Sequence, residues 1–157
     1  MKIFYTKNLG KYDDFVCVRE DGTTHQVQMP KIGSLPHDLV HFVVEKELAM
    51  ESGFYAHVEK GLIDGYYLKT ETAENPEQSA IDAKHAESIV ECFQAEFVSG
   101  AQSPEDFQYF LNVTCEERKI PHFQITGEQI ERIRKGLLSM NERWDAVKIG
   151  ETLELEF

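Results

Sequence analysis

The chain has 157 residues, of which 41% are hydrophobic and 28% charged, the composition of a globular protein and not of a disordered one. Acidic residues outnumber Lys and Arg by 28 to 16, so the formal net charge of -12 repels nucleic-acid phosphates and anionic lipids. No apolar run reaches the roughly 20 residues that span a bilayer. We therefore expect one cytoplasmic domain, residues 1–157, that binds neither nucleic acid nor membrane, and the odd number of cysteines favours reduced thiols.

The first thirty residues predict three strands: Ile3–Tyr5, Asp14–Glu20 and Thr23–Met29. Asp21-Gly22 separates the last two, and this dipeptide is typical of a two-residue hairpin turn. Such a turn pairs Val18 with His25 and gives the hairpin one buried face. That predicted face carries Val16, Val18, Val27 and Met29, with His25 at its end.

Five helices are expected after the hairpin. Ser34 is the predicted cap of a helix from Leu35 to Met50, and a shorter helix covers Phe54–Lys60. Three further helices begin at capping signatures, which start at Asn75, Ser103 and Thr126. The last residues, Thr152–Phe157, alternate between polar and apolar and predict a strand. The expected fold is α+β, with a small, mainly antiparallel sheet of N-terminal and C-terminal strands packed against about five helices.

The helix His37-Asp38-x-x-His41-x-x-x-Glu45 carries the chemistry of this sequence. His37 and His41 project from successive turns of one face, so both imidazoles can bind a single divalent cation such as Zn²⁺. Asp38 or Glu45 can orient an imidazole or serve as the general base. A third ligand must come from elsewhere, and His57 on the next helix, beside Glu59, is the first candidate. The reserve candidates are His25, His85 and His122.

Three resemblances involve this helix. Its HDxxH spacing resembles the zinc motif of a ubiquinone-biosynthesis protein family, but that motif places a glutamate where this chain has Gly53, so the activity does not carry over. The zinc-peptidase motif HExxH has its general base at the position of Asp38, whose side chain is one methylene shorter. The string Leu35–Glu45 and the ending Trp144, Gly150 and Leu153-Glu154-Leu155 are similar to a family of uncharacterised small bacterial proteins. The resemblance to these small bacterial proteins implies a bacterial origin and a shared fold, and no activity.

Two functional hypotheses follow. The first is a metal-dependent hydrolase of a small or uncharged substrate, with His37 and His41 on the ion and Glu45 or Asp38 moving the proton. The second is a non-catalytic binding or regulatory module, in which the histidine pair is structural and the acidic surface meets a basic partner. No Gly-rich phosphate loop is present, so a nucleotide cofactor is not expected. The oligomeric state is left open.

Overall fold

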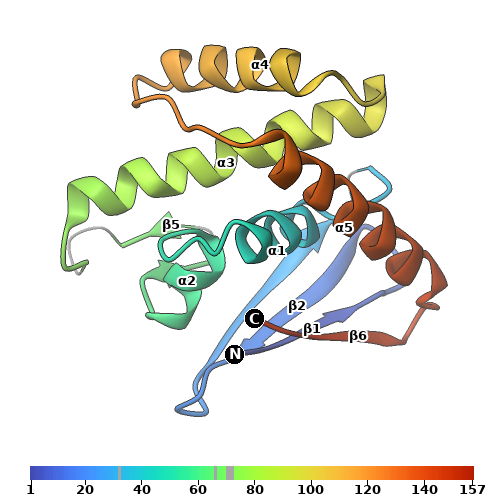
Figure 1. The fold of residues 1–157 in the computed structure, drawn as a ribbon. Coiled ribbons are helices and arrows are strands. Elements are labelled where there is room, and N and C mark those ends of the chain that lie inside the picture. Colours follow the sequence, from blue (N-terminus) through green and yellow to red (C-terminus); the bar gives the residue numbers. More distant parts are fainter. Residues whose placement is uncertain (32, 66, 70–72) are drawn as a thin grey trace.

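A computed structural model describes residues 1–31, 33–65, 67–69 and 73–157 (Figure 1). The elements in chain order are β1 (Lys2–Thr6), β2 (Tyr12–Val18), β3 (Thr24–Pro30), α1 (His37–Glu47), α2 (Phe54–Glu59), β4 (Ile63–Asp64), β5 (Tyr67–Leu68), α3 (Pro76–Ser99), α4 (Pro104–Glu117), α5 (Gly127–Ala146) and β6 (Thr152–Glu156). The main sheet is antiparallel, with strand order β3-β2-β1-β6. The α+β prediction is therefore confirmed, including the pairing of the C-terminal strand with the N-terminal ones.

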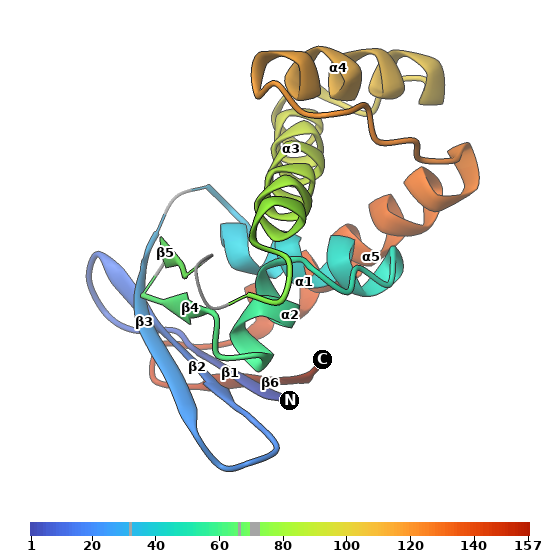
Figure 2. The same ribbon diagram turned by 90° about the vertical axis from the view of Figure 1, so that its left-hand side faces the viewer.

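The helices form layers over one face of the sheet (Figures 1 and 2). Helix α1 lies nearest the strands and contacts both α3 and α5, and α4 packs on the far side of α3. Each long strand alternates buried and less buried residues, since only one face is covered. Tyr5 and Phe15 from the sheet and Leu39 from α1 are fully buried in the shared core. Helix α1 is thus held between the sheet and the outer helices.

The hairpin between β2 and β3 corrects the predicted register by one residue. Arg19 donates its N–H to the carbonyl of Thr23, and Gly22 has a φ of 81°, so the loop has three residues where two were expected. Val18 therefore pairs with Thr24 and not with His25. A shift of one residue turns the side chains of β2 to the opposite faces, whereas His25, Val27 and Met29 of β3 stay on the predicted face. The buried face consequently carries Asp13, Phe15, Cys17, His25 and Met29, and Val16 and Val18 lie on the other side.

Helix α1 begins later than predicted. Its N-cap is Pro36, which offers no side-chain cap, and Ser34 lies outside the helix. The residue before a proline is disfavoured in helical conformation, which explains why Leu35 is not part of the helix. The other three predicted starts are confirmed, because the side chains of Asn75, Ser103 and Thr126 each accept a main-chain N–H in the first turn. Across the described ranges, no helix combines the length and apolar character needed to cross a bilayer.

Candidate metal centre

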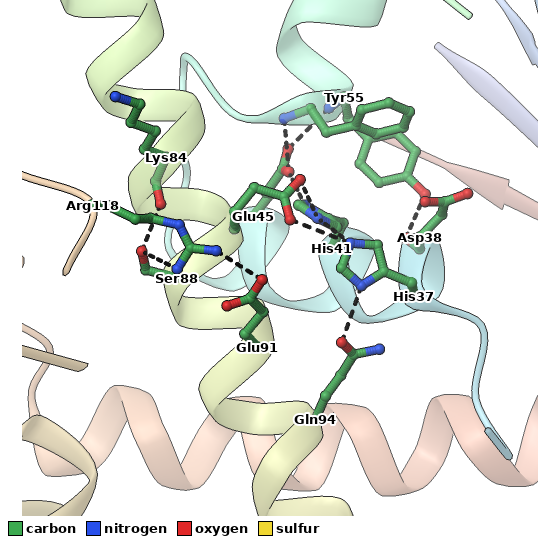
Figure 3. A network of polar contacts seen from close by, with 12 residues as sticks. His37, Asp38, His41, Glu45, Tyr55, Lys84, Ser88, Glu91, Gln94 and Arg118 are labelled. Atoms are coloured by element: carbon green, nitrogen blue, oxygen red, sulfur yellow. Dashed lines mark hydrogen bonds and ion pairs between the residues drawn. The ribbon is translucent and has the colours of Figure 1, made fainter. Parts of the chain in front are cut away.

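Two histidines of α1 and one glutamate of α3 converge at a partly exposed site (Figure 3). The Nε2 atoms of His37 and His41 lie 3.1 Å apart. A carboxylate oxygen of Glu87 lies 3.4 Å from the His37 Nε2, and the other lies 3.3 Å from the His41 Nε2. Zinc bonds of about 2.0–2.2 Å place neighbouring ligand atoms about 3.3–3.5 Å apart in a tetrahedral site. One ligand atom from each of the three side chains lies within 4.8 Å of the others, so small side-chain movements would bring them to the spacing of one face of a tetrahedral metal site.

Glu45 orients the His41 ring from the side opposite to Glu87. Its carboxylate oxygen Oε1 lies 2.8 Å from the His41 Nδ1, and both residues are buried. Because an ionised carboxylate only accepts hydrogen bonds, the Nδ1 carries the proton and the Nε2 presents its lone pair. The same carboxylate also accepts the main-chain N–H groups of Phe54 and Tyr55 at the start of α2. The carboxylate of Glu45 is thus fully engaged as a positioning group.

Gly53 leaves the space that this arrangement needs. A Cβ at position 53 would lie 2.3 Å from the carboxylate of Glu45, far inside the contact distance of two atoms. The glycine lets the chain pass close enough for α2 to present its first N–H groups to Glu45. Close packing at this point therefore depends on the absence of a side chain at residue 53.

The His37 ring is oriented by α3. The side-chain oxygen of Gln94 lies 3.0 Å from the His37 Nδ1, so this nitrogen donates and the His37 Nε2 is an acceptor as well. Two imidazole lone pairs and the carboxylate of Glu87 consequently face one another. Three acceptors cannot satisfy one another, so a proton or a metal cation must lie among them. This convergence is the chemical property that distinguishes the site.

The acid–base properties of the cluster follow from the same contacts. Burial opposes the charged form of His41, but hydrogen bonds to Glu45 and Glu87 raise the pKa of its imidazole to about 10. Burial would raise the pKa of Glu87, yet the hydrogen bonds from His37 and His41 hold that pKa far below its ordinary range. A proton is therefore strongly favoured between these groups in the metal-free protein, and a bound metal ion would replace it.

Asp38 is the polar group beside the cluster with no partner of its own. Asp38 is only 7% exposed, and no described residue donates a hydrogen bond to its carboxylate. Burial raises the pKa of this carboxyl group above its ordinary value. Its main-chain oxygen accepts the hydroxyl of Tyr55, which anchors the first turn of α1. Asp38 is thus a buried carboxyl group at the start of α1 to which no described residue donates a hydrogen bond.

His57 does not join the group formed by the α1 histidines. It is buried on α2, and neither ring nitrogen has a hydrogen-bond partner in the described structure. Glu59 is the last residue of α2, and its carboxylate pairs with the amino group of Met1. The Nε2–H of His85 donates a hydrogen bond to the carbonyl of Pro121. The third side chain that could bind a metal together with His37 and His41 is Glu87, a residue that the sequence analysis did not propose.

A polar pattern in the sequence marks the part of α3 that faces α1. Glu87, Glu91 and Gln94 are spaced by four and three residues, so they form one stripe along α3. This stripe could have indicated a polar face, although nothing local indicates that it meets α1.

Comparison with known proteins finds no matching family model, no similar curated protein and no similar solved structure. The resemblance to the small bacterial proteins therefore stays a prediction.

Proposed function

We propose that this protein is a metal-dependent hydrolase, in which His37, His41 and Glu87 hold Zn²⁺ or a similar divalent cation. The convergence of three acceptor groups at 3.1–3.4 Å carries the proposal. Two histidines and one glutamate are a known ligand set of catalytic zinc, and three protein ligands leave one coordination position for water or substrate. The carboxylate of Glu45 behind His41 supplies the second-sphere acceptor that metal-bound histidines usually have.

The proton chemistry is assigned to Asp38. The carboxylate of Glu45 is occupied by one imidazole and two main-chain N–H groups, so it positions His41 and takes no part in proton transfer. When the cation is bound, it acidifies a water molecule and polarises a carbonyl group. With such a cation held by His37, His41 and Glu87, Asp38 would take the proton that a water molecule loses as its oxygen bonds to the carbonyl carbon, and it would return that proton to the leaving group as the bond between carbon and the leaving group breaks. The water is consumed and Asp38 is regenerated.

The competing proposal is a non-catalytic module in which a proton takes the place of the metal. The raised pKa of His41 favours it, because a protonated His41 between Glu45 and Glu87 satisfies the same acceptors. In that case the cluster joins α1 to α3 and does nothing else. Metal content and thermal stability distinguish the two proposals.

The deciding experiment is metal analysis of protein purified without an affinity tag. We expect one zinc or similar ion per chain, or stoichiometric uptake of added Zn²⁺ by the metal-free protein. His41→Ala should abolish the binding, and His122→Ala, which removes an exposed imidazole paired with Glu116, should leave it intact. A protein that contains no metal and ignores added Zn²⁺, while His37→Ala and His41→Ala only lower its melting temperature, would establish the structural module.

Hydrolysis is tested separately from binding. We expect the zinc-loaded protein to cleave small uncharged esters or amides, and Asp38→Asn to remove this activity while the zinc content stays at the wild-type level. Loss of zinc from Asp38→Asn, or full activity without the carboxylate, would contradict the assignment of Asp38 as the general base.

A further inference from the structure

A cavity of about 460 Å³ adjoins the candidate metal centre. His37 and Asp38 form its inner end, at the first turn of α1. Met29, Pro30 and Pro36 form an apolar wall at the end of β3 and at the start of α1. A volume of this size accommodates a small organic molecule. A molecule in the cavity would therefore lie against both the imidazole of His37 and the unpartnered carboxylate of Asp38.

The polar residues of the cavity carry negative charge or none. Asp38, Glu91 and Gln94 line it, and none of the described lining residues is Lys or Arg. The guanidinium of Arg118 lies 2.7 Å from a Glu91 oxygen and also bonds to Ser88, so its charge is already paired (Figure 3). Away from the proposed cation and His37, an anionic ligand would meet no positively charged group among the described lining residues, and it would be repelled by the carboxylate of Asp38.

Gln94 offers a hydrogen-bond donor to a bound molecule. Its side-chain oxygen is turned toward His37, so the amide NH₂ group is directed away from that ring (Figure 3). No described residue accepts a hydrogen bond from this NH₂ group, and Gln94 lines the cavity. A carbonyl oxygen is the natural acceptor for an amide N–H. The cavity thus presents one donor, one proton acceptor and an apolar wall.

We infer that the cavity is the substrate site and that its ligand is a small, uncharged amide or ester with a short apolar group. This inference rests on the proposed hydrolase function. The apolar group would lie against Met29, Pro30 and Pro36, and the carbonyl oxygen would accept a hydrogen bond from the amide NH₂ group of Gln94. Arg118 neutralises Glu91, so Asp38 carries the one free carboxylate among the described lining residues, and that carboxylate is assigned to proton transfer. No second carboxylate of the described lining is left to bind an ammonium group. Phosphate esters and carboxylates whose charge lies away from the cation would be disfavoured by the carboxylate of Asp38.

Hydroxamic acids test this specificity, because they bind zinc through a group that all members of a series share. Isothermal titration of the zinc-loaded protein would compare acetohydroxamate with three compounds of similar length: butyrohydroxamate, the monohydroxamate of succinate and β-alanine hydroxamate. We expect butyrohydroxamate to bind about tenfold more tightly than acetohydroxamate, since each buried methylene contributes up to about fourfold. It should also bind about tenfold more tightly than the anionic succinate compound.

A matched pair of variants locates the charge discrimination. Glu91→Gln removes the carboxylate that pairs with Arg118 and leaves that guanidinium charge uncompensated beside the cavity, so we expect the preference for butyrohydroxamate over the succinate compound to fall at least about threefold. Glu77→Gln makes the same change in the first turn of the same helix, 14 residues or about 21 Å away, and should leave the preference unchanged. Zinc content should match the wild type in both variants, because neither residue is a proposed ligand.

The outcomes separate this inference from the proposed function. If the protein binds no zinc and no hydroxamate, the proposed function fails and the substrate inference fails with it. If zinc and acetohydroxamate bind but the succinate compound binds as well as butyrohydroxamate, the function stands and the inferred specificity is wrong. Tightest binding of β-alanine hydroxamate would likewise overturn the uncharged substrate in favour of an amine.

Discussion

Replacing Glu87 by glutamine separates a metal ligand from a structural ion pair. The carboxylate of Glu87 is 45% exposed and lies 3.3–3.4 Å from the two imidazoles, so its contribution to the metal-free fold is screened by solvent. Exposed ion pairs of this kind contribute about 0–1 kcal/mol. As the third ligand it should matter far more, since loss of an outer-sphere partner alone weakens metal binding about 10–100-fold. We therefore expect Glu87→Gln to lower zinc affinity at least about a hundredfold and to change metal-free stability by less than about 1 kcal/mol.

Thermal melts with and without zinc measure both quantities. Free zinc at one hundred times the dissociation constant stabilises the wild type by about 2.7 kcal/mol, which for a chain of this length raises the melting temperature by about 5–10 °C. At the same zinc concentration, a hundredfold weaker site gains only about 0.4 kcal/mol, or about 1–2 °C. Glu91→Gln, one turn along the same helix, is the control and should keep the full wild-type shift.

Two results would refute this reasoning. An undiminished zinc-induced shift in Glu87→Gln would show that the carboxylate is not a ligand. A large loss of stability in the metal-free variant, with no zinc-induced shift in the wild type, would identify the cluster as a structural ion-pair network.

Three further predictions test the groups around the site. Gly53→Ala forces a Cβ against the carboxylate of Glu45. We expect the free energy of unfolding, measured in urea, to fall by about 1–3 kcal/mol and zinc binding to weaken about 10–100-fold. Gly127→Ala, where a Cβ meets ordinary contact distances, is the control and should behave as wild type. His57→Met removes two buried ring nitrogens that lack described partners, so stability measured in the same way should stay within about 1 kcal/mol or rise, and zinc content should not change; loss of zinc would restore His57 as a ligand. In the metal-free protein the pKa of folded His41 is about 10, above the ordinary value of 6.5. The stabilisation of the fold by protonated His41 is therefore fully present below about pH 6.5 and is lost as the pH rises through 10. A urea unfolding midpoint that stays constant across that pH range would contradict the assigned contacts.

The histidine helix shows how far sequence patterns reach into the candidate site. The pairing of His37 with His41 was predicted because residues four apart share a helix face wherever that helix packs. The orienting role offered for Glu45 follows from the same spacing, and the structure places its carboxylate against His41. The partner that completes the group, Glu87, is 46 residues beyond His41, and no local pattern specifies which face of α3 meets α1.

The hairpin and the short helix α2 show the same division. The Asp-Gly pair located the turn, but the choice between a two-residue and a three-residue loop decided which side chains of β2 are buried, including Phe15. The predicted return of α2 toward α1 occurs through its first N–H groups, which bind Glu45, and the ring of His57 is directed elsewhere. A small change in rotation or register moved each of these side chains from the expected position.

The amino-acid sequence alone determined the fold class, the helix starts at Asn75, Ser103 and Thr126, the pairing of the last strand with the first ones, and the polar face of the histidine helix. These features depend on hydrogen bonds and apolar periodicity among residues close together in the chain. The tertiary structure alone decided that α3 supplies Glu87 and Gln94 to the histidines and that a cavity forms beside Asp38. Such contacts arise from the packing of whole apolar faces against one another, and the sequence records that packing only as a requirement for burial and not as a choice of partner.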